Sequence, residues 1–533
     1  MNYLITLTIL LVIRVSYSLE ETPNIMFIMA DQLRFDALSE ELSPNLSNLK
    51  STGYNFLHAY TSTPTCTPAR AAILTGRSPW YHGMLGYDDI AKHYPQGEYP
   101  ELLAASGYAL HSIGKNHFGW DKKLDQGQAH SFNSTNIYDG LGNGMPDGSE
   151  YDDYDRWFQE QKPGEDPLKN IDDWNSWHAL LYPYETFYHP TAWTGRNAVN
   201  FLNDYANISQ TSSAPPFFLK VSFHRPHSPY DPPVEYFNKV TDDLVNEPYA
   251  GGNWDERYKG PDHDCGPKHF DAWCGEMPLN ETLFSRKSYL ANVKFIDDQV
   301  GDIINSLEQN GLKENTFILF TADHGDGQGD HYHWRKGFPY EFSSHIPMIL
   351  WASNSGSLSS HDIDEPVELR DLFPTFLDIA GASDLIPSDL NGSSLINLIP
   401  ELRSKLHLTD LTSEPWREWI DLEHNICYNT TMHWNALTDG KMKYVYRAYF
   451  DDEQLFNMTA DPKEMESLHD KPEYAEELEL WRGRMVQQFE DEERGEKWVK
   501  DGVLQRRVEG QDRSPYYPKN MERNDIDVKI EII

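Results

Sequence analysis

The chain has 533 residues, of which 84 are acidic and 45 basic, giving a formal net charge of -39. This charge argues against nucleic acid or an anionic membrane surface as the main partner. It does not exclude a small anionic substrate, because a few Arg and Lys side chains and a metal ion can reverse the local field. The length allows a sizeable core and predicts two or more domains, or one large domain with a subdomain.

An apolar stretch, Leu4 to Val15, lies near the start of the chain and is followed by Ser16-Tyr17-Ser18. We interpret residues 1–18 as a signal peptide, although no Lys or Arg precedes the stretch. An uncleaved anchor is the alternative, but the stretch is short for a membrane span, and no later segment is apolar enough for one. Asn-x-Ser/Thr sequons support a secreted, or alternatively lysosomal, protein. They begin at Asn45, Asn133, Asn207, Asn280, Asn391, Asn429 and Asn457.

Continuous apolar runs predict buried strands at five places. They are Asn24–Ala30, Tyr108–Ile113, Phe217–Phe223, Thr316–Thr321 and Pro347–Trp351. Continuous apolarity, rather than alternation, indicates a sheet that is covered on both faces. Helical stretches such as 191–205 and 285–308 lie between the runs. This alternation predicts a doubly wound α/β architecture.

Charged or imidazole side chains follow four of these runs. In chain order they are Asp31, then Lys115 and His117, then His224, and finally Asp323 and His324. Ligands of open α/β sheets bind outside the carboxyl ends of the strands. The sequence therefore predicts one composite site at this edge of the sheet.

The pattern changes after about residue 405. Trp434–Thr438 and Met442–Tyr446, joined by the turn Asp439-Gly440, predict a β-hairpin. The charged segment 473–490 predicts an amphipathic helix. We therefore expect a main α/β domain over residues 19–404 and a small α+β C-terminal subdomain with a tail over 405–533.

Four cysteines are few for a secreted protein of this size. Cys265 and Cys274 are the plausible local disulfide, which would leave Cys427 unpaired. His263 and His269 lie beside that pair, so a zinc cluster is the alternative, although an oxidising compartment disfavours it.

Cys66 begins the pattern Cys-x-Pro-x-Arg, which continues with Pro68 and Arg70. Pro68 suits the first turn of a helix, because its missing N–H would be unpaired there anyway, and Gly76 can end the helix. Cys66 is thus expected at a helix N-terminus, where free N–H groups and the helix dipole favour negative charge. The alternative is an ordinary buried cysteine in front of a helix.

This cysteine pattern resembles the signature of the sulfatase family, within the alkaline-phosphatase-like superfamily. The resemblance covers roughly residues 23–465 and includes further segments in the family's order. They are Ile28-Met29-Ala30-Asp31-Gln32, Ile113-Gly114-Lys115-Asn116-His117-Phe118-Gly119, His224-Arg225-Pro226-His227, Thr321-Ala322-Asp323-His324-Gly325-Asp326 and Lys336-Gly337. The resemblance implies a mixed, mostly parallel sheet sandwiched by helices, with residues 19–404 as the catalytic domain.

The resemblance implies hydrolysis of sulfate esters. Cys66 would be converted to formylglycine (3-oxoalanine) by a formylglycine-generating enzyme during maturation, and the hydrate of this group would attack sulfur. Arg70 would orient the hydrate, and His117 would assist the hydrate or the later elimination of sulfate. Lys115 and Lys336 would hold the sulfate oxygens. His224 would face the leaving oxygen as an acid or a hydrogen-bond donor.

A divalent cation is also implied, with Ca²⁺ as the expected ion. Its ligands would be Asp31, Gln32, Asp323, His324 and the modified residue 66. Many sulfatases have a second Asp where this chain has Gln32, and His324 adds a nitrogen ligand. An amide oxygen can still bind a hard cation. Both differences resemble relatives that hydrolyse phosphonate or phosphate esters, so that activity stays open.

The family analogy favours a sulfated carbohydrate as substrate, with aryl sulfates as artificial ones. Trp120, Tyr230 and Trp334 are candidates for stacking on a sugar or an aryl group. A non-catalytic glycan-binding protein is the remaining alternative. It would follow if Cys66 stayed unmodified or the metal site stayed empty.

Overall fold

The computed structural model describes most of the chain. The described residues are 22–88, 90, 93–117, 130–140, 152–169, 175–211, 214–260, 265–353, 361–408, 415–425, 427–508 and 513–518. The signal peptide predicted for residues 1–18 lies outside them. None of the helices in these ranges combines the length and the apolar character needed to cross a membrane.

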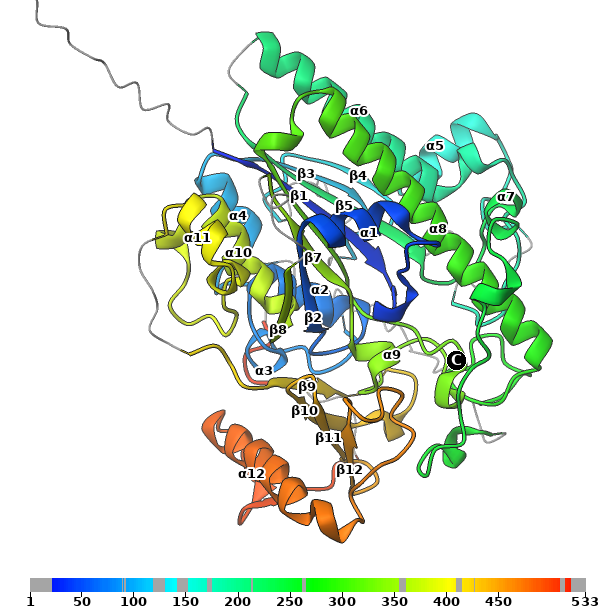
Figure 1. Ribbon diagram of the computed structural model, residues 1–533, viewed down its shortest axis with the longest axis vertical. Helices are drawn as coiled ribbons and strands as arrows, with labels where there is room; N and C mark the ends of the chain where they lie inside the picture. The colour runs from blue at the N-terminus through cyan, green and yellow to red at the C-terminus, as the bar shows by residue number, and fades with distance from the viewer. Residues whose placement is uncertain are drawn as a thin grey trace, which may run out of the picture.

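An eight-stranded sheet lies at the centre of the molecule, in the order β4-β3-β5-β1-β6-β7-β2-β8 (Figure 1). The strands are β1 (Asn24–Asp31), β2 (Tyr54–Tyr60), β3 (Ala109–Gly114), β4 (Ser134–Ile137), β5 (Phe217–Pro226), β6 (Thr316–Ala322), β7 (Met348–Trp351) and β8 (His361–Glu368). β7 runs antiparallel to β6 and β2, and the other neighbouring strands are parallel. The predicted mixed, mostly parallel sheet is confirmed.

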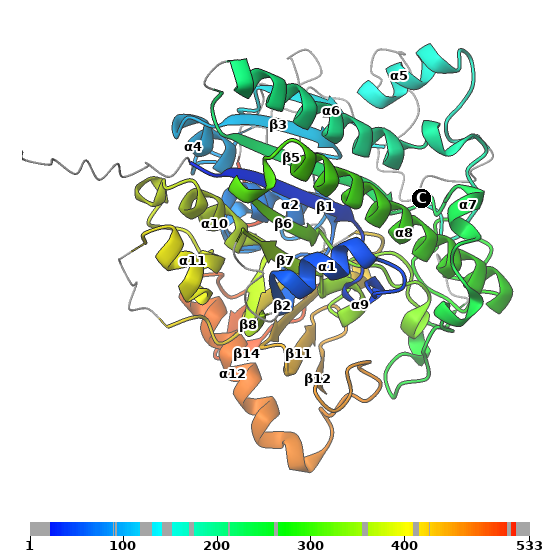
Figure 2. The same ribbon diagram turned by 45° about the horizontal axis from the view of Figure 1, so that its top comes forward.

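Helices cover both faces of this sheet (Figures 1 and 2). One layer contains α1 (Pro44–Thr52), α6 (Pro190–Thr211) and α8 (Leu279–Gln309), and the other contains α2 (Cys66–Thr75), α4 (Tyr99–Ala105) and α10 (Leu372–Ile379). Every residue of β1, β5 and β6 is buried. This double burial explains why apolar residues predominate in β1 and β6 and at the start of β5.

The five apolar runs all form strands, but three strands were not predicted. β4 and β8 lie at the two edges of the sheet. β8 is polar and partly exposed, and β2 exposes Leu57 in its middle. Strands that are only partly buried do not need continuous apolar residues, so the pattern that identified the central strands misses them.

A second, antiparallel sheet follows in the order β12-β11-β10-β9, at the lower end of Figure 1. Its strands are β9 (Ile420–His424), β10 (Trp434–Thr438), β11 (Met442–Arg447) and β12 (Asp452–Asn457), and α12 (Ala475–Asp491) packs on it. The predicted hairpin and helix are confirmed. Shorter elements include α3 (Pro79–His82), α5 (Asp153–Gln161), α7 (Val234–Phe237), α9 (Glu341–Ser344), α11 (Pro400–Lys405), β13 (Val499–Lys500) and β14 (Val503–Leu504).

A buried ionic network joins the small sheet to the main one. The Lys443 ammonium on β11 lies 2.7 Å from a carboxylate oxygen of Glu341 and 2.8 Å from one of Glu464. Glu341 on α9 also accepts hydrogen bonds from Tyr60 of β2, at 3.0 Å, and contacts the His345 ring. The Lys443 side chain has 0% exposure. The two sheets are therefore connected by a charge that water does not reach.

Cys265 and Cys274 form a disulfide, as predicted. Their sulfurs are therefore not available as zinc ligands, and the zinc alternative for this pair is wrong. Cys427 is a free thiol, also as predicted. His263, the histidine nearest to Cys265, lies outside the described residues.

Candidate active site

Cys66 is the first residue of α2 and is 2% exposed. Gly76 ends this helix in the left-handed conformation, with φ of 67°, and its N–H donates to the Ala72 carbonyl. The predicted helix from a cysteine to a glycine is confirmed. The N-terminus of α2 therefore presents residue 66 to the carboxyl edge of the sheet.

The four strands that carry the predicted site residues are neighbours in the order β3-β5-β1-β6. Because all four are parallel, their carboxyl ends meet at one edge. Asp31 is the last residue of β1 and Asp323 directly follows β6. Lys115 directly follows β3, and His224 lies near the carboxyl end of β5. The structure thus brings the predicted residues to a single place.

Asp31, Cys66, Asp323 and His324 form a compact set of metal-ligand types. One ligand atom from each lies within 4.8 Å of the others, and all four side chains are buried. His324 directs Nδ1 at the Gly325 carbonyl, at 3.0 Å, so its Nε2 faces the cluster. Two carboxylates and an oriented imidazole nitrogen are a donor set that suits a divalent cation.

Gln32, also predicted as a ligand, lies beside this set and presents its amide oxygen to Lys336. Its Nε2 donates to Asp326 at 2.5 Å, which leaves Oε1 facing Lys336 at 3.0 Å. Its backbone has a φ of 66° and its N–H donates to Asp323 Oδ1 at 3.0 Å. Left-handed backbone is costly for a residue other than glycine and is concentrated at functional sites. The amide oxygen of Gln32 is therefore held in a defined direction at the site.

Two lysines place positive charge next to residue 66. Lys336 Nζ lies 3.3 Å from Cys66 Sγ, and Lys115 Nζ lies 3.9 Å from it and forms an ion pair with Asp31. Burial alone would raise the pKa of the Cys66 thiol, but Lys115, Lys336 and His324 together bring that pKa well below its ordinary value. The surroundings of residue 66 therefore favour negative charge, as an anionic substrate requires.

Arg70 lies one helical turn after Cys66 and points back into the site. Its guanidinium lies 2.8 Å from Asp323 and 3.6 Å from Asp31. Burial would raise the pKa of Asp31, but Lys115, His227 and Arg70 lower it. Burial and the charge of Asp31 keep the pKa of Asp323 above its ordinary value, although His324 and Arg70 oppose this rise. Arg70 thus orients both carboxylates and favours their charged form.

His117 follows Lys115 with a φ of 52°, and its N–H donates to Asp139 at 2.9 Å. The N–H of Asn116 donates to the same Asp139 oxygen at 2.7 Å. The buried Nδ1 of His117 has no hydrogen-bond partner in the described part of the chain. The Asp139 contacts therefore hold this strained loop in place, and with it the His117 ring.

His224 is oriented by the residue that follows it. Arg225 Nη1 donates to His224 Nδ1 at 2.8 Å, and Arg225 is itself held by Asp231 at 2.6 Å. Nδ1 must then accept, so the ring proton is on Nε2, which is buried without a partner among the described residues. A Cβ at Gly140 would lie 2.5 Å from this nitrogen, so only glycine leaves the space open.

His227 and Asp326 belong to motifs whose sequence alone predicts no role for them. His227 Nδ1 donates to the Ser228 carbonyl at 2.6 Å, so its Nε2 accepts from Lys336 at 2.6 Å. Burial, followed by the charge of Lys336, lowers the pKa of His227 to about 3. Asp326 accepts from Gln32, as described above. His227 positions Lys336, and Asp326 positions Gln32. In the sequence, the short spacing between His224 and His227 is the signal that could have indicated a role for His227.

Two of the three aromatic candidates, Tyr230 and Trp334, do not line a pocket entrance. Tyr230 is 0% and Trp334 1% exposed, and the Tyr230 hydroxyl donates to Asp326 at 2.7 Å. Their burial in the wall of the fold excludes stacking on a substrate, so this prediction is wrong for both. Trp120 lies outside the described residues.

A family profile described as Sulfatase matches residues 23–382. The chain belongs to the sulfatase family. A second profile, described as N-sulphoglucosamine sulphohydrolase, C-terminal, matches residues 329–491 of this sulfatase. Its relatives include an arylsulfatase of Clostridium perfringens, 33% identical over 89% of this chain and 95% of that protein. A choline-sulfatase of Rhizobium meliloti is 27% identical over 84% of this chain and 83% of that protein.

Solved structures share the fold of this sulfatase. A phosphonate monoester hydrolase from Silicibacter pomeroyi has a TM-score of 0.68 at 21% identity and covers 91% of this chain and 100% of its own. A structure in complex with its substrate D-glucosamine-2-N,6-O-disulfate has a TM-score of 0.65 at 21% identity, covering 89% of this chain and 99% of its own. The predicted sulfatase family, enzyme class and fold are confirmed.

Proposed function

We propose that this sulfatase hydrolyses the sulfate ester of a sulfated carbohydrate, with residue 66 as its nucleophile after conversion to formylglycine by a formylglycine-generating enzyme. The observation that carries this proposal is the position of Cys66, at a helix N-terminus between Lys115 and Lys336. Formylglycine supplies a hydrated aldehyde as an oxygen nucleophile. A buried cysteine with only a packing role would not need two lysines within 4 Å of its sulfur.

The lysines bind the sulfate oxygens. Lys336 is aligned by His227 and Gln32, and Lys115 is aligned by Asp31. Their fixed ammonium groups can stabilise charge on the sulfuryl oxygens without reorganisation during the reaction. Arg70 orients residue 66 through the carboxylates that it holds. The His117 side chain, which hydrogen-bonds residue 66, is available to move a proton there.

His224 acts as a hydrogen-bond donor to the leaving oxygen, rather than as a cationic acid. Arg225 occupies Nδ1, so the group that His224 offers is its Nε2–H. Burial lowers the pKa of His224 well below its ordinary value, and Lys115 and Arg225 lower it further. A neutral ring at this position still stabilises charge that develops on the leaving oxygen.

Asp31, Gln32, Asp323 and His324, together with residue 66, would hold one divalent cation, for which we propose Ca²⁺. The ion would supply positive charge at the nucleophile and at the sulfate oxygens. Its oxygen ligands suit a hard cation, while His324 is a less typical ligand for calcium. We also propose that the protein is secreted or lysosomal and glycosylated. Asn207 and Asn280 are exposed sequon positions that support this route.

Two measurements test the proposed function. Peptide mass spectrometry of the tryptic fragment containing residue 66, from protein secreted by a eukaryotic host, should show a loss of about 18 Da for conversion to formylglycine. The converted protein should then hydrolyse 4-nitrophenyl sulfate faster than 4-nitrophenyl phosphate and phenylphosphonate esters. If the Cys66 thiol is intact in a host that converts the cysteine of other sulfatases to formylglycine, the proposed role of Cys66 is wrong. Preference for the phosphorus esters would favour the alternative hydrolase activity.

Calcium is expected to stabilise the protein through this cluster. After treatment with a chelator, adding Ca²⁺ at about 100 times its Kd should stabilise the fold by about 2.7 kcal/mol, visible as a higher melting temperature. Asp323→Asn should remove this gain, whereas Asp389→Asn, which changes a carboxylate that is 69% exposed, should keep it. An equal response in both variants would place the ion elsewhere, and a larger gain with Mg²⁺ or Zn²⁺ would exclude calcium.

A further inference from the structure

Arg335 is a buried cation that no carboxylate of the described residues neutralises. It is 3% exposed, and within the described part of the chain its guanidinium has neither a hydrogen bond nor an ion pair. Its Nε is fully buried without a partner. The guanidinium lies over the ring of Tyr428, 4.2 Å from the ring centroid. A cation–π contact offsets only part of the cost of burying such a charge.

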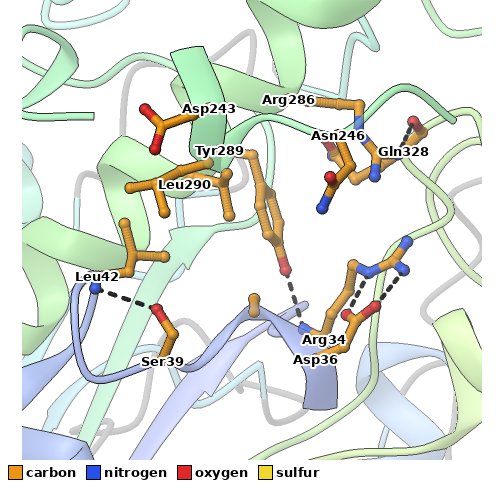
Figure 3. Close-up of a pocket in the computed structure, with 12 residues that line it drawn as sticks. Arg34, Asp36, Ser39, Leu42, Asp243, Asn246, Arg286, Tyr289, Leu290 and Gln328 are labelled. Atoms are coloured by element: carbon orange, nitrogen blue, oxygen red, sulfur yellow. Dashed lines mark hydrogen bonds and ion pairs between the residues drawn. The ribbon is translucent and has the colours of Figure 1, made fainter. Parts of the chain in front are cut away.

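Several other buried arginines have carboxylate partners, among them Arg34, Arg225 and Arg494. Figure 3 shows a hollow next to α8 in which Arg34 forms two bonds to Asp36. Arg34 and Arg286, which also borders this hollow, both contact Asp330, at 2.7 and 3.0 Å. Those charges are compensated within the protein, so this hollow offers no free cation. Arg335 differs because the N–H groups of its guanidinium have no hydrogen-bond acceptor among the described residues.

The backbone holds Arg335 in this position at some cost. Its φ is 65°, in the left-handed region. Its N–H donates to Asp326 Oδ1 at 3.1 Å, and its carbonyl accepts from the Gly327 N–H at 2.7 Å. Strained backbone that the surroundings enforce is typical of binding and catalytic positions. Asp326 also holds Gln32, so the same carboxylate fixes Arg335 and one side of the catalytic cluster.

Arg335 directly precedes one of the two lysines beside Cys66, and its N–H is bound by Asp326. The next residue, Lys336, reaches to 3.3 Å from Cys66 Sγ. Burial raises the pKa of the free thiol Cys427 to about 11, and the charges of Lys336 and Arg335 oppose this rise. Cys427 therefore lies near both cations, and its neighbour Tyr428 supports Arg335. Arg335 and Lys336 are therefore neighbouring cations near Cys427, and Lys336 contacts the position of the reacting sulfate.

We propose that Arg335 binds a second anionic group of the substrate, a carboxylate or a second sulfate, beside the sulfate ester that is hydrolysed. The inference rests on the proposed function, because residue 66 and Lys336 define the position of the reacting ester. A guanidinium presents paired N–H donors that match a carboxylate or sulfate in two parallel bonds. The substrate class is then a doubly anionic sugar unit, rather than a neutral sugar with one sulfate.

Matched sugars test this inference. We would measure kcat/KM for a glucose monosulfate, the corresponding glucuronic acid monosulfate, and the corresponding glucose disulfate with its second sulfate at the 6-position. Sets with the first sulfate at the 2-, 3- and 4-positions cover the unknown site of hydrolysis. The wild type should prefer one charged sugar by about 10- to 100-fold, mainly through KM, as expected for a charge-assisted hydrogen bond. The preferred sugar identifies carboxylate or sulfate as the second group.

Arg335→Gln should lower the ratio of charged to neutral sugar to near one. Arg257→Gln is the matched control, because Arg257 also lies over a ring, that of Phe450 at 4.6 Å, but is 39% exposed. This variant should keep the wild-type ratio. If the wild type shows no preference for a charged sugar, or if Arg335→Gln lowers all rates equally, the inference is overturned while the sulfatase function stands. Absence of hydrolysis of every sulfate ester would overturn the proposed function and the inference with it.

Stability provides a second, independent readout. Arg335→Gln should melt at the same temperature as the wild type or higher, because it removes a buried charge that has no ionic partner. Arg494→Gln should melt lower, because it leaves buried Glu423 without the guanidinium that now lies 2.8 Å away. A clear loss of stability in Arg335→Gln would mean that Arg335 has a structural role, and would overturn the binding role.

Discussion

Replacing Cys66 by alanine is expected to abolish sulfate ester hydrolysis, with a fall in kcat/KM of at least about 10⁴-fold. The variant keeps Lys115, Lys336 and the carboxylates, so sulfate binding survives while the nucleophile is lost. Alanine is close to cysteine in size and suits a helix, so the fold should remain intact. Turnover of 4-nitrophenyl sulfate and the melting temperature, measured on the same preparation, separate loss of catalysis from loss of folding.

Thr75→Ser is the matched control for this variant. Thr75 is a buried residue at the opposite end of α2 and bonds to the Ala71 carbonyl at 2.8 Å, a bond that serine can keep. Its activity should stay close to that of the wild type. Activity of Cys66→Ala within tenfold of the wild type would mean that residue 66 is not the nucleophile, and the assignment of the catalytic group would have to change.

Replacing Lys443 by methionine is expected to lower the free energy of unfolding by about 3–5 kcal/mol, the usual cost of removing one partner from a buried ion pair. The ammonium lies between Glu341 and Glu464, which would be left buried and uncompensated. Lys443 is on the small sheet and Glu341 is on the main domain, so the variant weakens the contact between these two parts. Urea unfolding followed by tryptophan fluorescence measures it.

Lys441→Met provides the control on the same hairpin. Its ammonium pairs with Asp364, but the lysine side chain is 55% exposed, so its loss should cost less than about 1 kcal/mol. The cost of Lys443→Met should also depend on pH. Without Lys443, burial raises the folded-state pKa of both carboxyls, so stability is retained at low pH and lost as pH rises. A variant as stable as Lys441→Met, or one insensitive to pH, would contradict the structural role of this network.

The core of the fold could be predicted from the sequence because its central strands are buried on both faces. β1 and β6 are mostly apolar, β5 begins with the apolar run Phe217-Phe218-Leu219, and that pattern depends on their own residues. β2, β4 and β8 escaped prediction because partly buried and edge strands tolerate polar residues. β9 was missed for a related reason, since Ile420–His424 is short and carries two acidic residues.

The candidate site could be predicted where a reactive or charged residue directly follows a strand or begins a helix. Asp31, Lys115 and Asp323 come directly at or after strand ends, and Cys66 stands before Pro68 at the start of α2. Other contributions depend on contacts between segments far apart in the chain. Lys336 is aligned by His227, and no local pattern in the sequence identifies that hydrogen bond.

The sequence by itself determined the central strands, the helix that begins at Cys66, the sulfatase family and the residue types at the sheet edge. These properties depend on local burial, helix capping and short motifs, which are written in neighbouring residues. Only the tertiary structure decided the strand order that brings four carboxyl ends together and the ring nitrogen that His224 presents. It also decided that Arg335 has no ionic partner among the described residues. Each of these depends on the presence or absence of a partner distant in sequence, and a single sequence does not record such pairings.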